Sequence, residues 1–119
     1  MKTLTPNLYI GFGSAAYALV KTDGQLQHEA SIKSRLVLVE QLHGHLAMQS
    51  FQLREHDQTP AEEAYQIALR YFSTHRRDLH IEVKNFFVKL LKNIARADDH
   101  ISRKETAFIN RFQRDLHKI

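Results

Sequence analysis

Apolar side chains recur every three or four residues through most of this chain, which is the spacing of one face of an α-helix. The longest run keeps that period throughout: Leu79, Val83, Phe86, Phe87, Leu90, Leu91 and Ile94. We expect Asp78 to cap this helix. A shorter run follows near the carboxyl end: Phe108, Ile109, Phe112 and Leu116. The pattern predicts an all-α fold, a compact bundle of about five to seven helices.

Two segments carry the capping box, a signature of a helix start. In this motif, the hydroxyl of a Ser or Thr accepts a hydrogen bond from the backbone N–H three residues later. The Glu at that later position accepts a hydrogen bond from the backbone N–H of the Ser or Thr. Thr59 and Glu62 have this spacing, with Pro60 suited to the first helical position. Ser102 and Glu105 have it again. We expect a helix to begin at each place.

The first half of the chain gives weaker signals. A helix from residue 6 to about residue 22 contains Gly11 and Gly13, which indicate close packing against a neighbour. A second helix, from near residue 27 to near Gly44, carries its apolar residues on one face: Ile32, Leu36, Val39, Leu42 and Leu46. Residues 47–51 form a short helix or the tail of the second one. Residues 52–58 are polar and predict a loop.

Composition bounds the class of protein. The 119 residues suffice for one domain, 1–119, and 43% hydrophobic with 25% charged residues is ordinary for a globular protein. The chain has no cysteine, which excludes disulfides, thiolate metal sites and a cysteine nucleophile. No apolar run is long enough to span a membrane. We expect a cytoplasmic protein, and the net charge of +4 leaves acidic partners open.

One motif imitates a dinucleotide-binding unit. Residues 11–16, G-F-G-S-A-A, fit G-x-G-x-x-A, and residues 36–40 resemble a strand ending in an acid. Only three residues, 8–10, would form the preceding strand, and no further parallel strands follow. Because so small a sheet cannot hold a cofactor, we disfavour this interpretation.

Two short segments resemble each other at a distance of 75 residues (98 − 23). Each has a helix end, then Asp23 or Asp98, an aliphatic residue three further on, and a glutamate after that, Glu29 or Glu105. The repeat predicts two helical hairpins related by pseudo-twofold symmetry, with the acidic loops in equivalent places. Neither loop is an EF-hand, since oxygen ligands are missing at its first and third positions.

The second segment, A-R-A-D-D-H-I-S-R-K-E over residues 95–105, resembles the signature of the TerB family of tellurite-resistance proteins. Related domains occur in DjlA-type co-chaperones. The first segment, K-T-D-G-Q-L-Q-H-E over residues 21–29, is a degenerate copy. The resemblance implies an all-α domain associated with tellurite and other stress responses, with a divalent-metal site built from the two acidic loops.

Carried over by position, the implied metal ligands are Asp23, Glu29, Asp98 and Glu105. Asp99 stands where the family has Gly, and it adds a carboxylate to the second loop while changing its backbone. Carboxylate oxygens suit Ca²⁺, Mg²⁺ or Mn²⁺. Solvated turn residues without a metal are the alternative interpretation of these acids.

Other chemistry is weakly signalled. The eight histidines include no pair that shares a helix face with another ligand, and no nucleophile motif is present, so we expect no enzymatic activity. The last helix has a basic side: Lys104, Arg111, Arg114 and Lys118. It could contact phosphates, although charged residues usually face water on such helices.

Three hypotheses follow. The first is a TerB-like module of a stress response that binds a divalent cation and engages a protein partner. The second is a metal-independent helical interaction domain, with a homodimer as one form. The third, nucleic-acid binding, is the least favoured.

Overall fold

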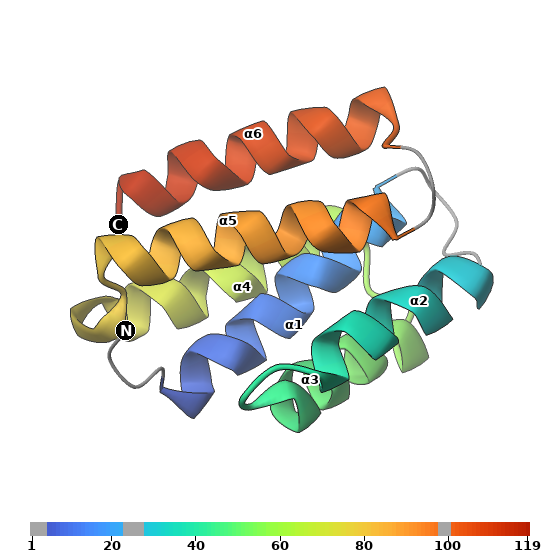
Figure 1. Cartoon of the computed structure of the whole chain (residues 1–119), viewed down its shortest axis with the longest axis horizontal. Helices are drawn as coiled ribbons and strands as arrows, with labels where there is room; N and C mark the ends of the chain where they lie inside the picture. The colour runs from blue at the N-terminus through green and yellow to red at the C-terminus, as the bar shows by residue number, and fades with distance from the viewer. Residues whose placement is uncertain (1–4, 23–27, 98–100) are drawn as a thin grey trace.

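The computed structural model describes residues 5–22, 28–97 and 101–119, and in these ranges every regular element is a helix (Figure 1). The elements are α1 (Pro6–Lys21), α2 (His28–Val39), α3 (Gly44–His56), α4 (Ala61–Thr74), the 3₁₀ turn η1 (Arg76–Asp78), α5 (Ile81–Arg96) and α6 (Arg103–His117). The predicted all-α bundle is confirmed. The candidate dinucleotide motif lies within α1, and so do residues 8–10, which the motif would need as a strand.

Helix α1 is the centre of the bundle, and α3 and α4 pack most extensively against it. Every residue from Leu8 to Leu19 except Ile10 is buried, because this helix is apolar or small on all sides. Figure 1 shows α1 running behind α5 and between α4 and the α2–α3 pair. One continuous apolar core surrounds it.

The glycines of α1 allow the close approach that the sequence predicts. A Cβ on Gly13 would lie 2.1 Å from the carbonyl oxygen of Ala47 on α3. A Cβ on Gly11 would lie 2.7 Å from the Cβ of Tyr71 on α4. Both distances are shorter than van der Waals contact, so each glycine sets how deeply one helix seats on α1.

The apolar faces predicted in the second half are confirmed. Nearly all the apolar residues predicted on α5 and α6 are buried, with Phe86 partly so. Aromatic rings join these helices to the rest of the core. Phe12 and Phe87 stack with ring centroids 4.9 Å apart, and Phe72 meets Phe112 edge-on at 5.9 Å.

The predicted apolar face of the second helix is wrong. Helix α2 ends at Val39, Leu46 belongs to α3, and the inward positions of α2 are Ser31, Ser34 and Leu38. The other predicted face residues point outward: Ile32, Leu36, Val39 and Leu42. Gly44 begins α3 instead of ending α2. It lies close to the end of α2, where a Cβ would be 2.1 Å from the carbonyl oxygen of Leu38.

The predicted loop over residues 52–58 is also wrong for its first part, because α3 continues to His56. Residues 52–55 read as a loop because they are largely polar, but Gln, Leu, Arg and Glu are good helix formers. Buried Phe51 anchors this stretch to the core. The helix is followed by Gln58, which has a positive φ of 53°.

Of the three predicted helix caps, Ser102 is confirmed, and Thr59 and Asp78 are wrong. Ser102 and Glu105 form the complete capping box, with both N–H···O distances 3.0 Å. Pro60 occupies the N-cap of α4 in place of Thr59, without a side-chain capping bond. Asp78 lies in η1, and His80 is the N-cap of α5. None of the helices in the described ranges has the length and apolar character needed to cross a membrane.

Candidate functional site

The predicted metal ligands are only partly within the described residues. Asp23, Asp98 and Asp99 lie outside them. Glu29 is 75% exposed at its side chain and pairs with Lys33, one turn along α2, at 3.3 Å. Glu105 accepts the backbone N–H of Ser102 in the capping box. Each of these two glutamates, Glu29 and Glu105, therefore already has a partner on its own helix or at its start.

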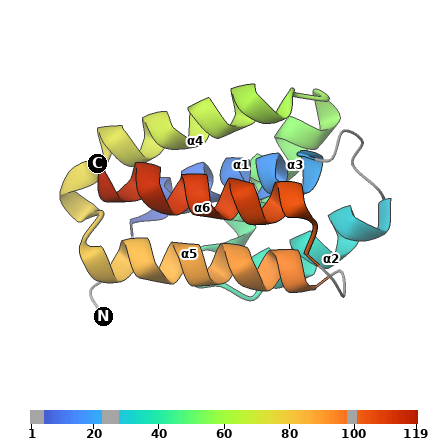
Figure 2. The same ribbon diagram turned by 90° about the horizontal axis from the view of Figure 1, so that it is seen from above.

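The helix ends that flank the two acidic loops lie at the same end of the bundle. Figures 1 and 2 both show the last turns of α1 and α5 and the first turns of α2 and α6 at that end. Within the described ranges, no group of three or more His, Asp or Glu side chains is arranged to hold a metal ion.

A stripe of apolar side chains lies on the outside of α2. Its members are one helical turn apart, and their exposed fractions are 39% for Ile32, 59% for Leu36 and 47% for Val39. The inward face of the same helix holds two buried serines, Ser31 and Ser34, beside Leu38. The Ser31 hydroxyl donates to the Glu55 carboxylate of α3 at 2.5 Å, and the Ser34 hydroxyl donates to the Ala30 carbonyl. Burying serine while exposing leucine opposes the usual sorting of side chains.

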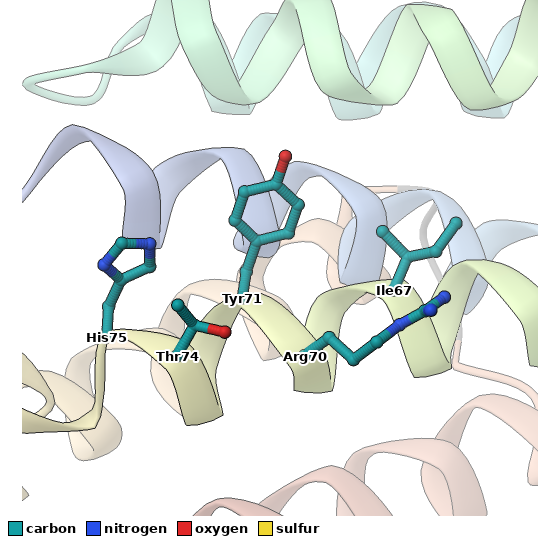
Figure 3. Close-up of a pocket in the computed structure, with 5 residues that line it drawn as sticks. All are labelled: Ile67, Arg70, Tyr71, Thr74 and His75. Carbon is teal, nitrogen blue, oxygen red and sulfur yellow. The ribbon is translucent and has the colours of Figure 1, made fainter.

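A second apolar surface lies between α3 and α4. Both helices pack on α1 and have little direct packing on each other, so α1 forms the floor of a groove. We call it the α3–α4 groove; its apolar residues are Ile10, Leu46, Leu53, Ile67 and Tyr71. Figure 3 shows the side chains of Ile67 and Tyr71 projecting from α4 over α1.

Two arginines lie beside these apolar residues. Arg54 of α3 lines the groove itself, and Arg70 lines an adjoining hollow on α4, with Thr74 and His75, that shares Ile67 and Tyr71 with the groove. His75 stacks on Tyr71 with ring centroids 6.5 Å apart. The Nε atom of Arg54 is buried without a hydrogen-bond partner among the described residues. The groove is therefore apolar in its middle and basic at its sides.

The opposite side of α4 carries a polar network with α6. Arg111 donates two hydrogen bonds to Glu62, and its guanidinium lies 4.2 Å from the ring centre of Tyr65. The Tyr65 hydroxyl donates to the Asp115 carboxylate at 2.5 Å. The pKa of Tyr65 is raised, mainly by burial and secondly by this hydrogen bond. Arg111, predicted to belong to a basic stripe, is thus already paired.

The chain has no significant match among protein-family models, curated proteins or solved structures. The TerB resemblance therefore stays a prediction.

The α2 stripe and the α3–α4 groove are functional candidates that sequence patterns missed. The signal for the stripe was present, since Ser31, Ser34 and Leu38 share helical spacing and so form a second face of α2. The groove had no local signal, because its walls come from segments separated along the chain.

Proposed function

We propose that this chain is a non-enzymatic helical interaction domain that associates with a second copy of itself through the α2 stripe. The observation that carries the proposal is the exposed apolar stripe of α2, where Ile32, Leu36 and Val39 face outward while two serines face the core beside Leu38. Exposed apolar clusters of this kind typically mark interaction surfaces.

The spacing of the stripe supports a second copy as the partner. Ile32 and Val39 lie four residues before and three after Leu36. In an antiparallel pair of α2 helices related by a twofold axis near Leu36, Ile32 of one copy meets Val39 of the other. A twofold interface requires such self-complementarity, in which each contact occurs twice.

The charges beside the stripe have the same symmetry. Lys33 lies three residues before Leu36 and Glu40 lies four residues after it. The antiparallel pairing brings Lys33 of one copy near Glu40 of the other, twice per dimer. Because a single helix face is smaller than the roughly 800 Å² per partner of a standard interface, we expect a dissociation constant of about micromolar or weaker.

Analytical ultracentrifugation over a range of concentrations tests this proposal. We expect wild type to self-associate and Leu36→Glu to remain monomeric. Ile81→Glu, which places the same charge on an exposed apolar residue of α5, is the matched control and should self-associate as wild type does.

A charge swap tests the orientation. Lys33→Glu and Glu40→Lys should each weaken association, and the double variant should restore it. A wild-type chain that stays monomeric near millimolar concentration contradicts the homodimer. Association that Leu36→Glu leaves unchanged rules out the α2 stripe.

Divalent-cation binding at the acidic loops is the second candidate, and the gathering of their flanking helix ends at one end of the bundle favours it. Asp23, Asp98 and Asp99 would supply oxygen ligands suited to Ca²⁺, Mg²⁺ or Mn²⁺. Such a module would fit the stress response that the TerB resemblance implies, with tellurite as one stress.

Thermal unfolding of chelator-treated protein tests this candidate. An ion that binds only the folded chain adds about 2.7 kcal/mol of stability at a concentration one hundred times its dissociation constant. Asp23→Asn/Asp98→Asn should lose that gain, whereas Asp57→Asn/Asp78→Asn, which removes two exposed carboxylates elsewhere, should keep it. Superimposable curves with and without each ion would leave the loops as turn structures.

A further inference from the structure

The α3–α4 groove is long enough to hold about two turns of a further helix. Its α3 side extends from Leu46 to Arg54 and, with the adjoining hollow, its α4 side extends from Ile67 to His75, nine residues or eight steps each. At 1.5 Å per residue each wall is about 12 Å long, which is about two turns of a docked helix. A helix lying along such a channel can place its side chains between those of both walls.

The apolar residues of the groove are spaced to receive one face of a helix. Leu46 and Leu53 are two turns apart on α3, and Ile67 and Tyr71 are one turn apart on α4. Leu53 is 50% exposed, so its side chain still has apolar area to bury. An occupant with apolar residues at positions i, i+4 and i+7 would cover these side chains.

The charged residues beside the groove determine which residues should border the apolar face of the bound helix. Arg54 on α3 and Arg70 on α4 line adjoining hollows, and neither side chain forms an ion pair or hydrogen bond within the described part of the chain. Among the described residues that line the groove and its adjoining hollow, none is acidic. The Arg54 Nε donor is buried without an acceptor, so a partner carboxylate would bind the part of the half-buried Arg54 guanidinium that is still accessible.

We propose that the α3–α4 groove binds an amphipathic helix of a partner protein whose apolar face is flanked by Asp or Glu residues. This surface lies on α3 and α4 and is distinct from the α2 stripe, so the proposal does not depend on dimer formation. Complementary charge sets which segments bind, and apolar burial supplies most of the affinity.

The composition of the chain makes a direct test convenient. The protein contains no Trp, so a Trp in a synthetic helical peptide reports only on the peptide. Three 14-residue probes differ in one property each. The first has Leu at i, i+4 and i+7 with Glu flanks, the second has the same Leu with Lys flanks, and the third has Ala in place of Leu with Glu flanks.

Titrations followed by Trp anisotropy should show binding of the Leu/Glu peptide. Each of the other two peptides should bind at least about tenfold more weakly, since one lacks the charge match and the other the apolar face. Added salt should weaken the Leu/Glu complex.

A charge-reversed groove gives the decisive comparison. Arg54→Glu/Arg70→Glu should exchange the preference, so that the Leu/Lys peptide binds better. Arg70→Glu alone changes only an exposed residue and should weaken the Leu/Glu peptide about fivefold even if the double variant does not fold. Arg103→Glu/Lys104→Glu, which reverses two exposed charges at the start of α6, should bind as wild type does.

Two further variants separate this surface from α2. Leu53→Lys should abolish binding of the Leu/Glu peptide, and Leu36→Glu should leave it unchanged. Equal affinity for Glu-flanked and Lys-flanked peptides, no binding of any probe, or loss of binding in Leu36→Glu would overturn the proposal.

Discussion

Arg111 of α6 donates two parallel hydrogen bonds to Glu62 of α4, 2.7 Å from Nη1 to Oε1 and 2.8 Å from Nη2 to Oε2. The two residues are 49 positions apart in the chain. A fork-to-fork geometry of this kind fixes the orientation of both side chains as well as their distance. The pair thereby ties the last helix to the side of α4 that faces away from the α3–α4 groove.

This pair makes stability depend on pH in a defined window. Hydrogen bonding from Arg111, and then from Gln66, lowers the pKa of Glu62 from 4.5 to about 2. A carboxyl whose pKa is lower in the folded state stabilises the fold above its unfolded pKa and loses that contribution as the pH falls towards the folded value. Because Glu62 is 61% exposed, we expect only about 0.2–1 kcal/mol.

Urea unfolding of wild type and Glu62→Gln from pH 2 to pH 7 measures this contribution. The difference in free energy of unfolding should be constant above about pH 5 and should disappear towards about pH 2. Glu63→Gln, an exposed neighbour on α4, is the control. A difference that does not vary with pH would contradict the role of the Glu62 charge.

The neighbouring tyrosine should contribute through its hydroxyl. Tyr65→Phe removes the 2.5 Å hydrogen bond to Asp115 and leaves the ring in place, so we expect a loss of about 1–2 kcal/mol. Tyr71→Phe is the matched control, since no hydrogen bond of the Tyr71 hydroxyl is present in the described structure. Chemical denaturation of the three proteins compares them, and equal losses in both variants would count against the Tyr65–Asp115 bond.

The start of α6 depends on its capping box. Ser102→Ala removes the acceptor of the Glu105 N–H and should cost about 1 kcal/mol in thermal or chemical unfolding. Thr5→Ala provides the comparison, because Thr5 is the N-cap of α1 without a side-chain capping bond and its hydroxyl is buried unpaired. We expect Thr5→Ala to be neutral or slightly stabilising. Similar destabilisation by both substitutions would argue against the capping box.

The contact of α1 with α3 should not tolerate a side chain at Gly13. Gly13→Ala places a Cβ 2.1 Å from the Ala47 carbonyl oxygen, and the two backbones must separate to admit it. We expect a loss of about 2–3 kcal/mol despite the better helix propensity of Ala. Ser73→Ala, at an exposed position of α4, is the control and should be nearly neutral. Wild-type stability in Gly13→Ala would show that the helices can move apart at little cost.

The second half of the bundle was predictable from sequence because its signals are local. On α5 and α6 the apolar residues other than exposed Ile81 form one main face, so there was one way to bury each helix. The capping box at Ser102 and Glu105 is made within one turn and needs no distant partner. Gly11 and Gly13 indicated tight packing on α1, although not which helices would seat there.

The candidate surfaces required the tertiary structure. Helix α2 has two faces that could be buried, and burial of Ser31 next to Glu55 of α3 was decided by contacts beyond the helix itself. Glu62 had a local capping role open to it, yet it pairs with Arg111. The α3–α4 groove exists because two helices seat on α1 apart from each other.

Sequence alone therefore determined that the chain is helical and which faces of its strongly amphipathic helices are buried. Only the tertiary structure decided that the apolar stripe of α2 faces outward and that Arg54 and Arg70 line adjoining hollows beside Ile67 and Tyr71. The physical reason is the distance along the chain over which each interaction acts. Helix formation and capping act within a few residues, whereas burial and charge pairing depend on which distant segments meet.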